Sequence, residues 1–270
     1  MILHLNGHDI QLHIEGERAF GEKVNLLSTD DDLTQNTEFA SLGYTIKPFL
    51  NDELFQNFKQ GIKSLILDYL KDAGLAVDDN FDLRQYHQLI GDNYQRHLEV
   101  IERTKLIQNA DFPIDISLVE KRITDVCKVP LRVKNPFTGE EVFHLRVIRP
   151  HTTDHNPLHR DVWQDENRNA INLYVPLIGS NELSSLTIVP ESHHWTEDLT
   201  ERTMQGAIVN KIRFNVPGLT RSKKPLDIIR PNPGENEVLI FSPYLIHGGA
   251  INLNTDMTRI SLEMRLWRKI

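Results

Sequence analysis

The amino-acid sequence predicts an α+β fold in which α-helices buttress a double-stranded β-helix, the jelly-roll or cupin-like barrel. In the first half of the chain apolar residues recur at helical spacing, and from Pro130 onward they alternate with a period of two. Helices followed by many short strands are typical of α+β proteins with a sandwich or barrel. Because no Pro/Gly/Ser-rich linker divides the chain, we expect one domain over 1–270. It comprises an N-terminal hairpin and connection (1–37), a mainly helical buttress (38–129) and the barrel core (130–270).

The N-terminal segment carries a hairpin signal. Residues 2–14 alternate on both sides of Asn6-Gly7, and Asn-Gly is the pair that favours a type I′ turn. We expect an edge hairpin outside the barrel core, followed by a polar, solvated connection over Ser28–Thr37.

The clearest helix begins at Asn51 or Asp52, either of which can cap it, and ends near Ala73-Gly74, where glycine suits the C-terminal turn. Its apolar residues keep helical spacing: Leu54, Phe55, Phe58, Ile62, Leu65, Ile66 and Tyr69. Two further helices are predicted around Asp92–Gln108 and Ile116–Lys128.

The second half of the chain reads as strands. Leu131–Val133, a turn over Asn135–Gly139, and Val142–Ile148 together predict a hairpin. Further strands are predicted around 170–178, 184–190, 207–216, 226–230, 237–247 and 258–268.

Composition excludes several classes of protein. The chain has 270 residues, of which 39% are apolar, enough for a substantial core and too many for a disordered chain. Its net charge of −8 argues against nucleic acid or an anionic membrane as the main partner. No stretch approaches the ~20 apolar residues that span a bilayer, and no signal peptide is visible. The single cysteine, Cys127, excludes an internal disulfide, and we expect it to be buried. We therefore expect a soluble, cytoplasmic protein, with its oligomeric state left open.

A metal-binding pattern lies in the barrel half. His159 and Asp161 are two residues apart, so on a strand both side chains point to the same face, and His247 follows much later in the chain. Two histidines and one carboxylate form the facial triad of non-haem Fe(II) oxygenases, which leaves coordination positions open. We therefore expect His159, Asp161 and His247 to hold Fe(II) as catalytic residues.

An anion-binding pattern follows the last metal ligand. Arg259 and Ser261 share one face of the final predicted strand. A guanidinium fork with a hydroxyl beside it suits one end of a dicarboxylate. Together with the triad, this clamp points to 2-oxoglutarate and O2 as co-substrates. Asn172 and Tyr174, which also share a face, are candidates to donate hydrogen bonds to 2-oxoglutarate.

The remaining polar residues near these motifs have open alternatives. His144 and Arg146 share a face of the strand that leads to the triad, so they either bind a polar or anionic substrate group or point outward from an antiparallel sheet. Trp163, beside the triad, is a third candidate for the substrate site. For Glu263 and Arg265 we expect a salt bridge on the barrel wall.

Zinc is the rival metal. His151, His155 and His159 have the i, i+4, i+8 spacing that lines one face of a helix, as in hydrolytic zinc sites. Pro150 and Pro157 bracket this segment and disfavour a helix. His151 and His155 then either border the substrate entrance or are exposed loop residues.

Three segments resemble a known family. The runs Asn172–Leu177 and Leu186–His194 are similar to the Trp-x-Pro-Leu and Leu-x-Val-Val-Pro-Gly-Ser-His segments of phytanoyl-CoA dioxygenase-like Fe(II)/2-oxoglutarate oxygenases, and Leu42–Leu50 looks like their usual opening. The similarity spans roughly residues 38–270. Tyr174 replaces the common tryptophan, Glu191 replaces the common glycine, and 181–185 lacks the usual Asn-Gly turn. In this resemblance the loop with His193 and His194 mainly orders the barrel.

The resemblance and the motifs together imply a dioxygenase. It would hydroxylate, or otherwise oxidise, an unactivated C–H bond of a small polar molecule and release succinate and CO2. Because Asp161 supplies the carboxylate, hydroxylation is favoured over halogenation. The alternatives are a non-catalytic small-molecule or metal-binding protein on the same barrel and a zinc-dependent hydrolase. A damaged triad or a missing clamp would indicate the non-catalytic binding protein. Product formation without O2 would indicate the hydrolase.

Overall fold

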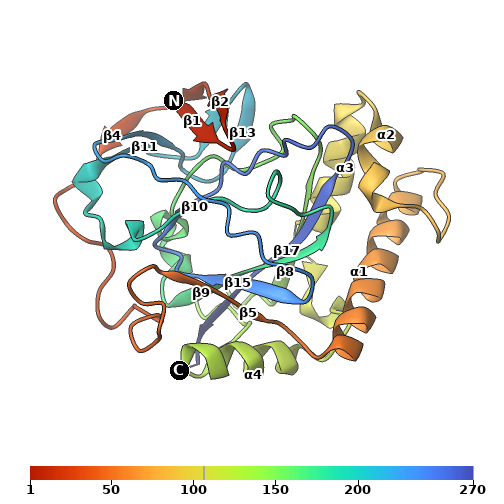
Figure 1. The fold of residues 1–270 in the computed structure, drawn as a ribbon, viewed down its shortest axis with the longest axis horizontal. Helices are drawn as coiled ribbons and strands as arrows, with labels where there is room; N and C mark the ends of the chain where they lie inside the picture. The colour runs from red at the N-terminus through yellow and green to blue at the C-terminus, as the bar shows by residue number, and fades with distance from the viewer. Residues whose placement is uncertain (106, 270) are drawn as a thin grey trace.

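A computed structural model describes residues 1–105 and 107–269, and it confirms the α+β fold. Figure 1 shows helices α1–α3 gathered at one end of the large sheet, and the small N-terminal strands at the other. The α-helices among the described residues are α1 (Asp52–Asp72), α2 (Tyr86–Ile90), α3 (Tyr94–Thr104) and α4 (Ile116–Cys127). Among those residues no helix has the length and apolar character that crossing a membrane would require.

Seven antiparallel strands form the large sheet. Their order is β5–β15–β9–β17–β8–β6, and β7 pairs with β17 beyond the end of β8. The bounds are β5 (Tyr44–Pro48), β6 (Ile107–Gln108), β7 (Leu131–Arg132), β8 (Val142–Ile148), β9 (Ala170–Ile178), β15 (Glu237–Phe241) and β17 (Arg259–Arg268).

Four smaller sheets complete the strands. Strand β10 (Ile188–Val189) pairs with β16 (Ile246–His247), and the N-terminal hairpin joins β1 (Ile2–Leu5) to β2 (His8–Gln11). The two three-stranded sheets are β14 (Leu219–Ser222), β11 (Thr200–Thr203) and β4 (Arg18–Phe20), and β13 (Ile212–Phe214), β12 (Ala207–Val209) and β3 (Ile14–Glu15).

The expected N-terminal hairpin and first helix are confirmed. Asn6 and Gly7 have φ values of 51° and 76°, as a type I′ turn requires. Leu3 and Leu5 of the hairpin pack against Leu158 in a second apolar cluster. In α1, the Asn51 side chain accepts a hydrogen bond of 2.9 Å from the backbone N–H of Leu54.

The period-two alternation of the sheet separates a core face from a cavity face. Leu145 and Val147 of β8 belong to one large apolar cluster with residues of α1, α3 and α4, as do Ile260 and Leu262 of β17. The buried Cys127 belongs to it too. The intervening side chains of these strands therefore point to the opposite face of the sheet, where they line a cavity.

Several predicted elements are wrong in detail. Residues 131–148 do not form a hairpin, because β7 and β8 both pair with β17, Arg132 opposite Trp267 and Arg146 opposite Ser261. The turn itself exists, since the N–H of Gly139 donates to the carbonyl of Asn135 over 2.9 Å.

Other strands are shorter or divided. The 207–216 segment is a hairpin of two strands, because Asn210 and Lys211 adopt left-handed φ values of 47° and 73°. The 237–247 segment breaks at 242–245, and 226–230 makes only the single bridge between Ile229 and Ile188. Helix α2 was not predicted. The helix expected over Asp92–Gln108 is α3 and ends at Thr104; Leu106, within that range, lies outside the described residues.

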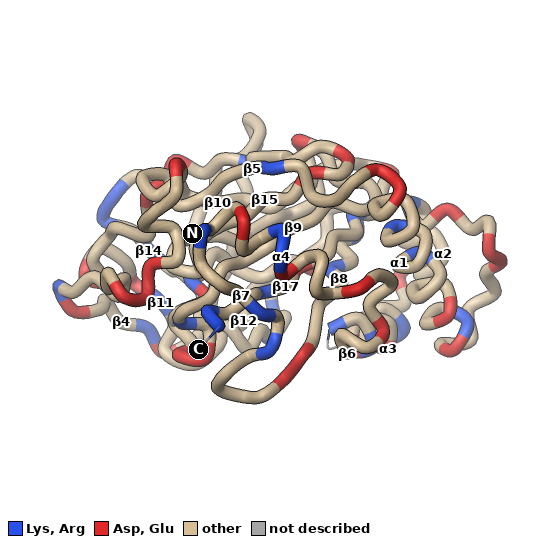
Figure 2. The backbone as a smooth tube through the Cα atoms, turned by 90° about the horizontal axis from the view of Figure 1, so that it is seen from below, with Lys and Arg blue, Asp and Glu red and all other residues tan. Residues whose placement is uncertain are grey.

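Charged residues are dispersed along the chain. Figure 2 shows positions of Lys and Arg interspersed with those of Asp and Glu over most elements.

Candidate metal and co-substrate site

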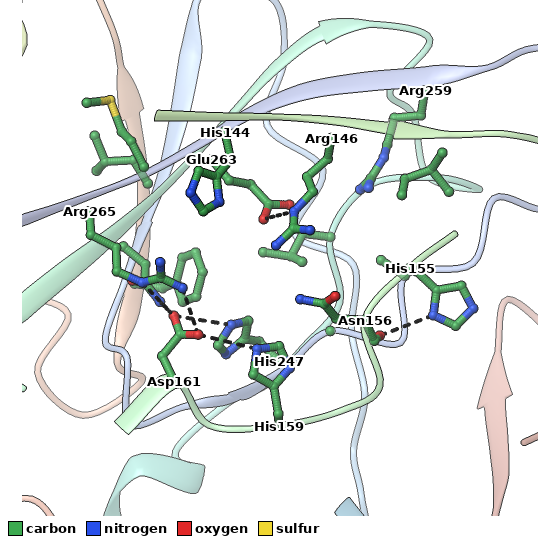
Figure 3. A pocket seen from close by; sticks show the side chains of 18 of the residues that line it. His144, Arg146, His155, Asn156, His159, Asp161, His247, Arg259, Glu263 and Arg265 are labelled. Atoms are coloured by element: carbon green, nitrogen blue, oxygen red, sulfur yellow. Dashed lines mark hydrogen bonds and ion pairs between the residues drawn. The ribbon is translucent and has the colours of Figure 1, made fainter. Parts of the chain in front are cut away.

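The structure brings His159, Asp161 and His247 together. His159 and His247 form an isolated antiparallel bridge with reciprocal backbone hydrogen bonds of 2.8 and 2.9 Å, and their ring centroids lie 4.4 Å apart. Asp161 opens a 3₁₀ turn rather than continuing a strand, and its backbone N–H donates to the carbonyl of Pro243 over 3.0 Å. One ligand atom from each of the three residues lies within 4.8 Å of the other two. All three are buried, and Figure 3 shows their side chains directed toward one another.

Backbone carbonyls determine which imidazole nitrogen is free. Nδ1 of His159 donates to the carbonyl of Pro157 over 2.8 Å, and Nδ1 of His247 donates to that of Leu245 over 2.9 Å. Each Nε2 is then unprotonated and faces Asp161, at 3.3 and 3.7 Å. Burial, together with His159, lowers the pKa of His247 to about 4. A neutral imidazole oriented through its second nitrogen is the usual form of a metal-binding histidine.

The carboxylate of Asp161 is held on one oxygen. Asn172 Nδ2 donates to Oδ2 over 2.7 Å, and Arg265 Nε donates to the same oxygen over 3.1 Å. Burial opposes ionisation, but the Arg265 guanidinium holds the pKa of Asp161 well below its ordinary value. Arg265 Nη2 lies 2.8 Å from Oδ1 without hydrogen-bond geometry, so buried Oδ1 has no hydrogen-bond partner. Two imidazole nitrogens and one unpartnered carboxylate oxygen fit a divalent metal.

Two expectations about these side chains need correction. Glu263 and Arg265 do not pair: Arg265 contacts Asp161, and Glu263 accepts a hydrogen bond of 2.9 Å from Nε of Arg146. Asn172, expected to donate to 2-oxoglutarate, donates to Asp161 instead. In both cases cross-strand register decides the partner. Arg265 lies directly opposite Asn172, and both therefore reach the same carboxylate.

Arg259 lies at the other end of the cavity from Arg265 (Figure 3). It is only 2% exposed, and its Nε and Nη1 have no hydrogen-bond partner. No carboxylate among the described residues lies within ion-pair distance of it. Its guanidinium lies over the ring of Tyr174, 5.7 Å from the centroid. A buried, unpaired guanidinium that lines a cavity is a binding site for an anion.

Ser261 and Tyr174, the two residues expected to bind 2-oxoglutarate beside Arg259, do not point polar groups into the cavity. Ser261 is buried and its Oγ has no partner, yet it does not line the cavity. The hydroxyl of Tyr174 is engaged with Ser180 Oγ at 2.7 Å, so Tyr174 supports Arg259 from one side. Neither side chain donates into the cavity in this arrangement.

The metal triad, Arg259 and side chains of β8, β9, β15 and β17 line one cavity. His144, Arg146 and Ile148 line it, which settles the inward face of β8. Burial and the neighbouring Arg146 lower the pKa of His144 to about 3, so its imidazole is neutral. Trp163 does not line the cavity, because its indole N–H donates to Glu197 over 2.9 Å.

The histidine-rich segment before the triad is not helical. His151 has a left-handed φ of 53° and is exposed, whereas His155 is buried and lines the cavity. The helical zinc site is therefore absent from the described chain. Nδ1 of His155 contacts the carbonyl of Asn156 at 3.1 Å, and its Nε2 has no hydrogen-bond partner.

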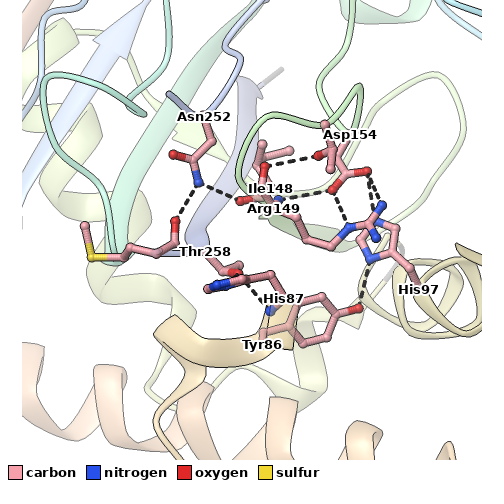
Figure 4. A network of polar contacts seen from close by, with 10 residues as sticks. Tyr86, His87, His97, Ile148, Arg149, Asp154, Asn252 and Thr258 are labelled. Atoms are coloured by element: carbon pink, nitrogen blue, oxygen red, sulfur yellow. Dashed lines mark hydrogen bonds and ion pairs between the residues drawn. The ribbon is translucent and has the colours of Figure 1, made fainter. Parts of the chain in front are cut away.

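A buried polar network ties this segment to the helices (Figure 4). Asp154 accepts two hydrogen bonds of 2.9 Å from the guanidinium of Arg149, and lies 3.3 Å from Nε2 of His97 in α3. The hydroxyl of Tyr86 in α2 lies 2.9 Å from Nδ1 of the same histidine. Although burial opposes it, His97 and Arg149 lower the pKa of Asp154. The helical buttress thus holds the loop that ends at His159.

Sequence reasoning missed this network and a second one. Arg160, between two of the ligands, is 1% exposed and forms a buried ion pair with Glu197. Nη2 of Arg160 also donates to the carbonyl of Ser192 over 2.6 Å, in the loop that holds His193. His193 in turn contacts the carbonyl of Ala40 at 2.9 Å, as expected for a structural residue. The signal in the sequence that could have revealed this network is a charged residue, such as Arg160, among neighbours that are expected to be buried.

Comparisons with known proteins show the fold. No known protein family matches the sequence, and no curated protein matches it either. Among solved structures, the non-haem monooxygenase ThoJ in its apo form matches with a TM-score of 0.51 at 12% identity, over 88% of this chain and 77% of that one. EctD from S. alaskensis, solved with 2-oxoglutarate and 5-hydroxyectoine, matches with a TM-score of 0.48 at 13% identity, over 95% and 84%. The chain therefore has an oxygenase-like jelly-roll fold with a buried His-Asp-His triad.

Proposed function

We propose that this protein is an Fe(II)- and 2-oxoglutarate-dependent dioxygenase that hydroxylates an unactivated C–H bond of a small polar molecule. When bound, the iron and 2-oxoglutarate supply the oxidising chemistry with O2, in which decarboxylation to succinate and CO2 accompanies oxidation of the substrate. The chain's own residues bind and orient these groups.

Three side chains would hold the metal. Nε2 of His159 and Nε2 of His247 are directed to it by the carbonyls that accept from their Nδ1 atoms. Oδ1 of Asp161 completes the set, while Asn172 and Arg265 hold Oδ2. Three protein ligands leave open positions on an octahedral ion. Because the carboxylate is present, hydroxylation is favoured over halogenation.

Arg259 would bind the distal carboxylate of 2-oxoglutarate. The observation that supports this proposal most is its buried, unpartnered guanidinium in the same cavity as the triad. Ser261, whose buried hydroxyl is also unpartnered, would assist Arg259 from the same strand. Tyr174 holds the guanidinium in place through its ring.

The proposed enzyme comprises one domain, in which 1–37 form an N-terminal hairpin and connection, 38–129 a mainly helical buttress and 130–270 the barrel core. A cytoplasmic location stays a prediction.

Binding and turnover of 2-oxoglutarate test the proposal. Under anaerobic conditions, calorimetry should show 2-oxoglutarate binding that depends on Mn(II), a redox-stable substitute for Fe(II). With Fe(II) and O2, the protein should form succinate slowly without substrate and faster once a substrate is added. Protein that binds Mn(II) but no 2-oxoglutarate would contradict the assignment, and product formation without O2 would indicate a hydrolase.

A further inference from the structure

The Arg265 end of the cavity is the more exposed one, because the Arg265 side chain is 27% exposed and Arg259 is 2% exposed. A second hollow adjoins the cavity and shares four residues with it: Val142, His144, Arg265 and Trp267. Its other walls are the 135–140 loop and the 164–167 turn. Arg259 lies at the opposite end, six residues earlier on β17, or roughly 20 Å of extended strand. If 2-oxoglutarate occupies the Arg259 end, a substrate enters past His144 and Arg265.

The charges on this substrate side are compensated in pairs. Nε of Arg146 donates to Oε2 of Glu263 over 2.9 Å, and Arg265 is paired with Asp161 at 2.8 Å. The pKa of His144 is about 3, so its imidazole adds a hydrogen-bonding group and no charge. The two ends of the cavity therefore differ, because Arg146 and Arg265 each face a carboxylate, whereas Arg259 has no carboxylate within ion-pair distance among the described residues.

The Arg146–Glu263 pair is open to a ligand. About a quarter of each side chain is exposed, 24% and 27%, and both residues line the cavity. Neither side chain makes another hydrogen bond or ion pair to any described residue. Arg146 thus presents free N–H donors beside a free carboxylate oxygen of Glu263. A ligand with net charge would compete with one member of the pair and leave the other uncompensated in a buried site.

We propose that the Arg146–Glu263 pair recognises the substrate and selects a group without net charge that places a hydrogen-bond acceptor beside a donor. Two kinds of small molecule have this chemistry: a sugar or polyol with neighbouring hydroxyls, and an amino acid with its carboxylate and ammonium. The inference rests on the proposed function, since it assumes that the triad and Arg259 bind the metal and 2-oxoglutarate. It narrows the expectation that Arg146 binds a polar or anionic substrate group to a polar group without net charge.

A charge-sorted ligand screen tests the selection directly. Protein loaded with Mn(II) and 2-oxoglutarate is screened by saturation-transfer NMR against uncharged sugars and polyols, zwitterionic amino acids, net anions such as sugar acids, and net cations such as amino-acid amides. Hits should come from the first or second set, and the set that provides them identifies the kind of substrate. Hits confined to anions or cations, or no hits in the first two sets, would overturn the proposal.

Charge-deleting variants test whether this pair is responsible. Glu263→Gln leaves Arg146 uncompensated, so the best net-neutral hit should bind to this variant at least about tenfold more weakly than to wild type. A carboxylated analogue of that hit should bind to the variant more tightly than to wild type. Arg146→Gln should shift the preference towards cations. The control is Glu141→Gln, the same change in an ion pair with Lys134 (3.5 Å) that lies outside the cavity. Identical charge preference in Glu263→Gln and Glu141→Gln would overturn the role of the pair.

Two further measurements keep the outcomes separate. If Glu263→Gln does not fold, the double variant Arg146→Gln/Glu263→Gln removes both charges and should weaken the net-neutral hit without favouring either ion. Unchanged affinity in that double variant would refute the role. Wild-type protein that binds no 2-oxoglutarate overturns the proposed function as well, whereas protein that binds it but prefers charged ligands overturns the recognition role alone.

Discussion

Replacing Arg259 with alanine removes a guanidinium that is 2% exposed and whose Nε and Nη1 find no partner in the described structure. If this group binds 2-oxoglutarate, its loss removes a charge-assisted interaction that is shielded from water. Truncating one member of such a buried pair costs roughly 2–5 kcal/mol of binding free energy. Since ~1.4 kcal/mol is a factor of ten, the dissociation constant should rise between about 30-fold and several thousand-fold.

The same substitution should leave the fold largely intact. It removes a cation that has been taken out of water without a counter-charge, which favours the variant, and it removes the cation–π contact with Tyr174, which disfavours it. Because these effects oppose one another, the free energy of unfolding without ligand should stay within about 1 kcal/mol of wild type. A large loss of affinity without a large loss of stability is the expected signature of a binding residue.

Anaerobic calorimetry of 2-oxoglutarate binding to Mn(II)-loaded protein, beside urea denaturation of the metal-free form, measures both quantities. Arg259→Lys should recover only part of the affinity, because lysine has no planar fork. Arg268→Ala is the matched control, since Arg268 is on the same strand but does not line the cavity. If Arg259→Ala binds 2-oxoglutarate as tightly as wild type, the assignment of the anion site is refuted.

Three other substitutions test the metal centre and its surroundings. Asp161→Ala should weaken Mn(II) binding by more than the ~10–100-fold typical of outer contacts, and calorimetry that finds an unchanged dissociation constant would exclude the triad. Gly248→Ala should destabilise the fold and weaken Mn(II) binding. Gly248 has a φ of 101°, and an added Cβ would lie 2.3 Å from the carbonyl oxygen of Pro157 and 3.0 Å from Nδ1 of His159. Gly74→Ala, whose Cβ would meet nothing within 4 Å, is the control for backbone strain alone, and equal losses in both would refute the packing argument. Burial lowers the pKa of His193 from 6.5 to about 4, so the folded state binds a proton on this residue less readily than the unfolded state does. The free energy of unfolding should therefore fall as the pH drops from 6.5 towards 4, by about 2 kcal/mol between pH 7.5 and 5. Urea midpoints at both pH values should show less of this loss in His193→Gln, and an identical loss would count against burial as its cause.

The sequence was sufficient to predict part of the local structure and the residues of the candidate metal site. The cap at Asn51, the Asn6-Gly7 turn and the inward alternation of β17 depend on neighbouring residues, which a sequence displays directly. His159 and His247 were paired from their chemical type, and the bridge between them confirms their proximity.

Strand partners could not be predicted in the same way. Alternation tells which face a side chain takes, but not which strand lies beside it, and β7 and β8 therefore looked like a hairpin although each pairs with β17. The partner of Arg265 was wrong for the same reason. Its position opposite Asn172 results from the register between β17 and β9. The Asp154–Arg149–His97 network joins segments that are distant in sequence, and no local pattern reveals it.

Strand β17 places Arg259, Glu263 and Arg265 on the cavity face at two- and four-residue spacing, with Ile260 and Leu262 between them on the core face. A deletion of one codon in the middle of this strand would turn every later side chain to the opposite face. Charged groups would then enter the apolar core while leucines replaced them in the cavity. Homologues that diverge by insertion and deletion should therefore change length in the loops that flank this strand and keep the strand itself at constant length. Length variation across β17 in an alignment of related chains would indicate a different use of the cavity.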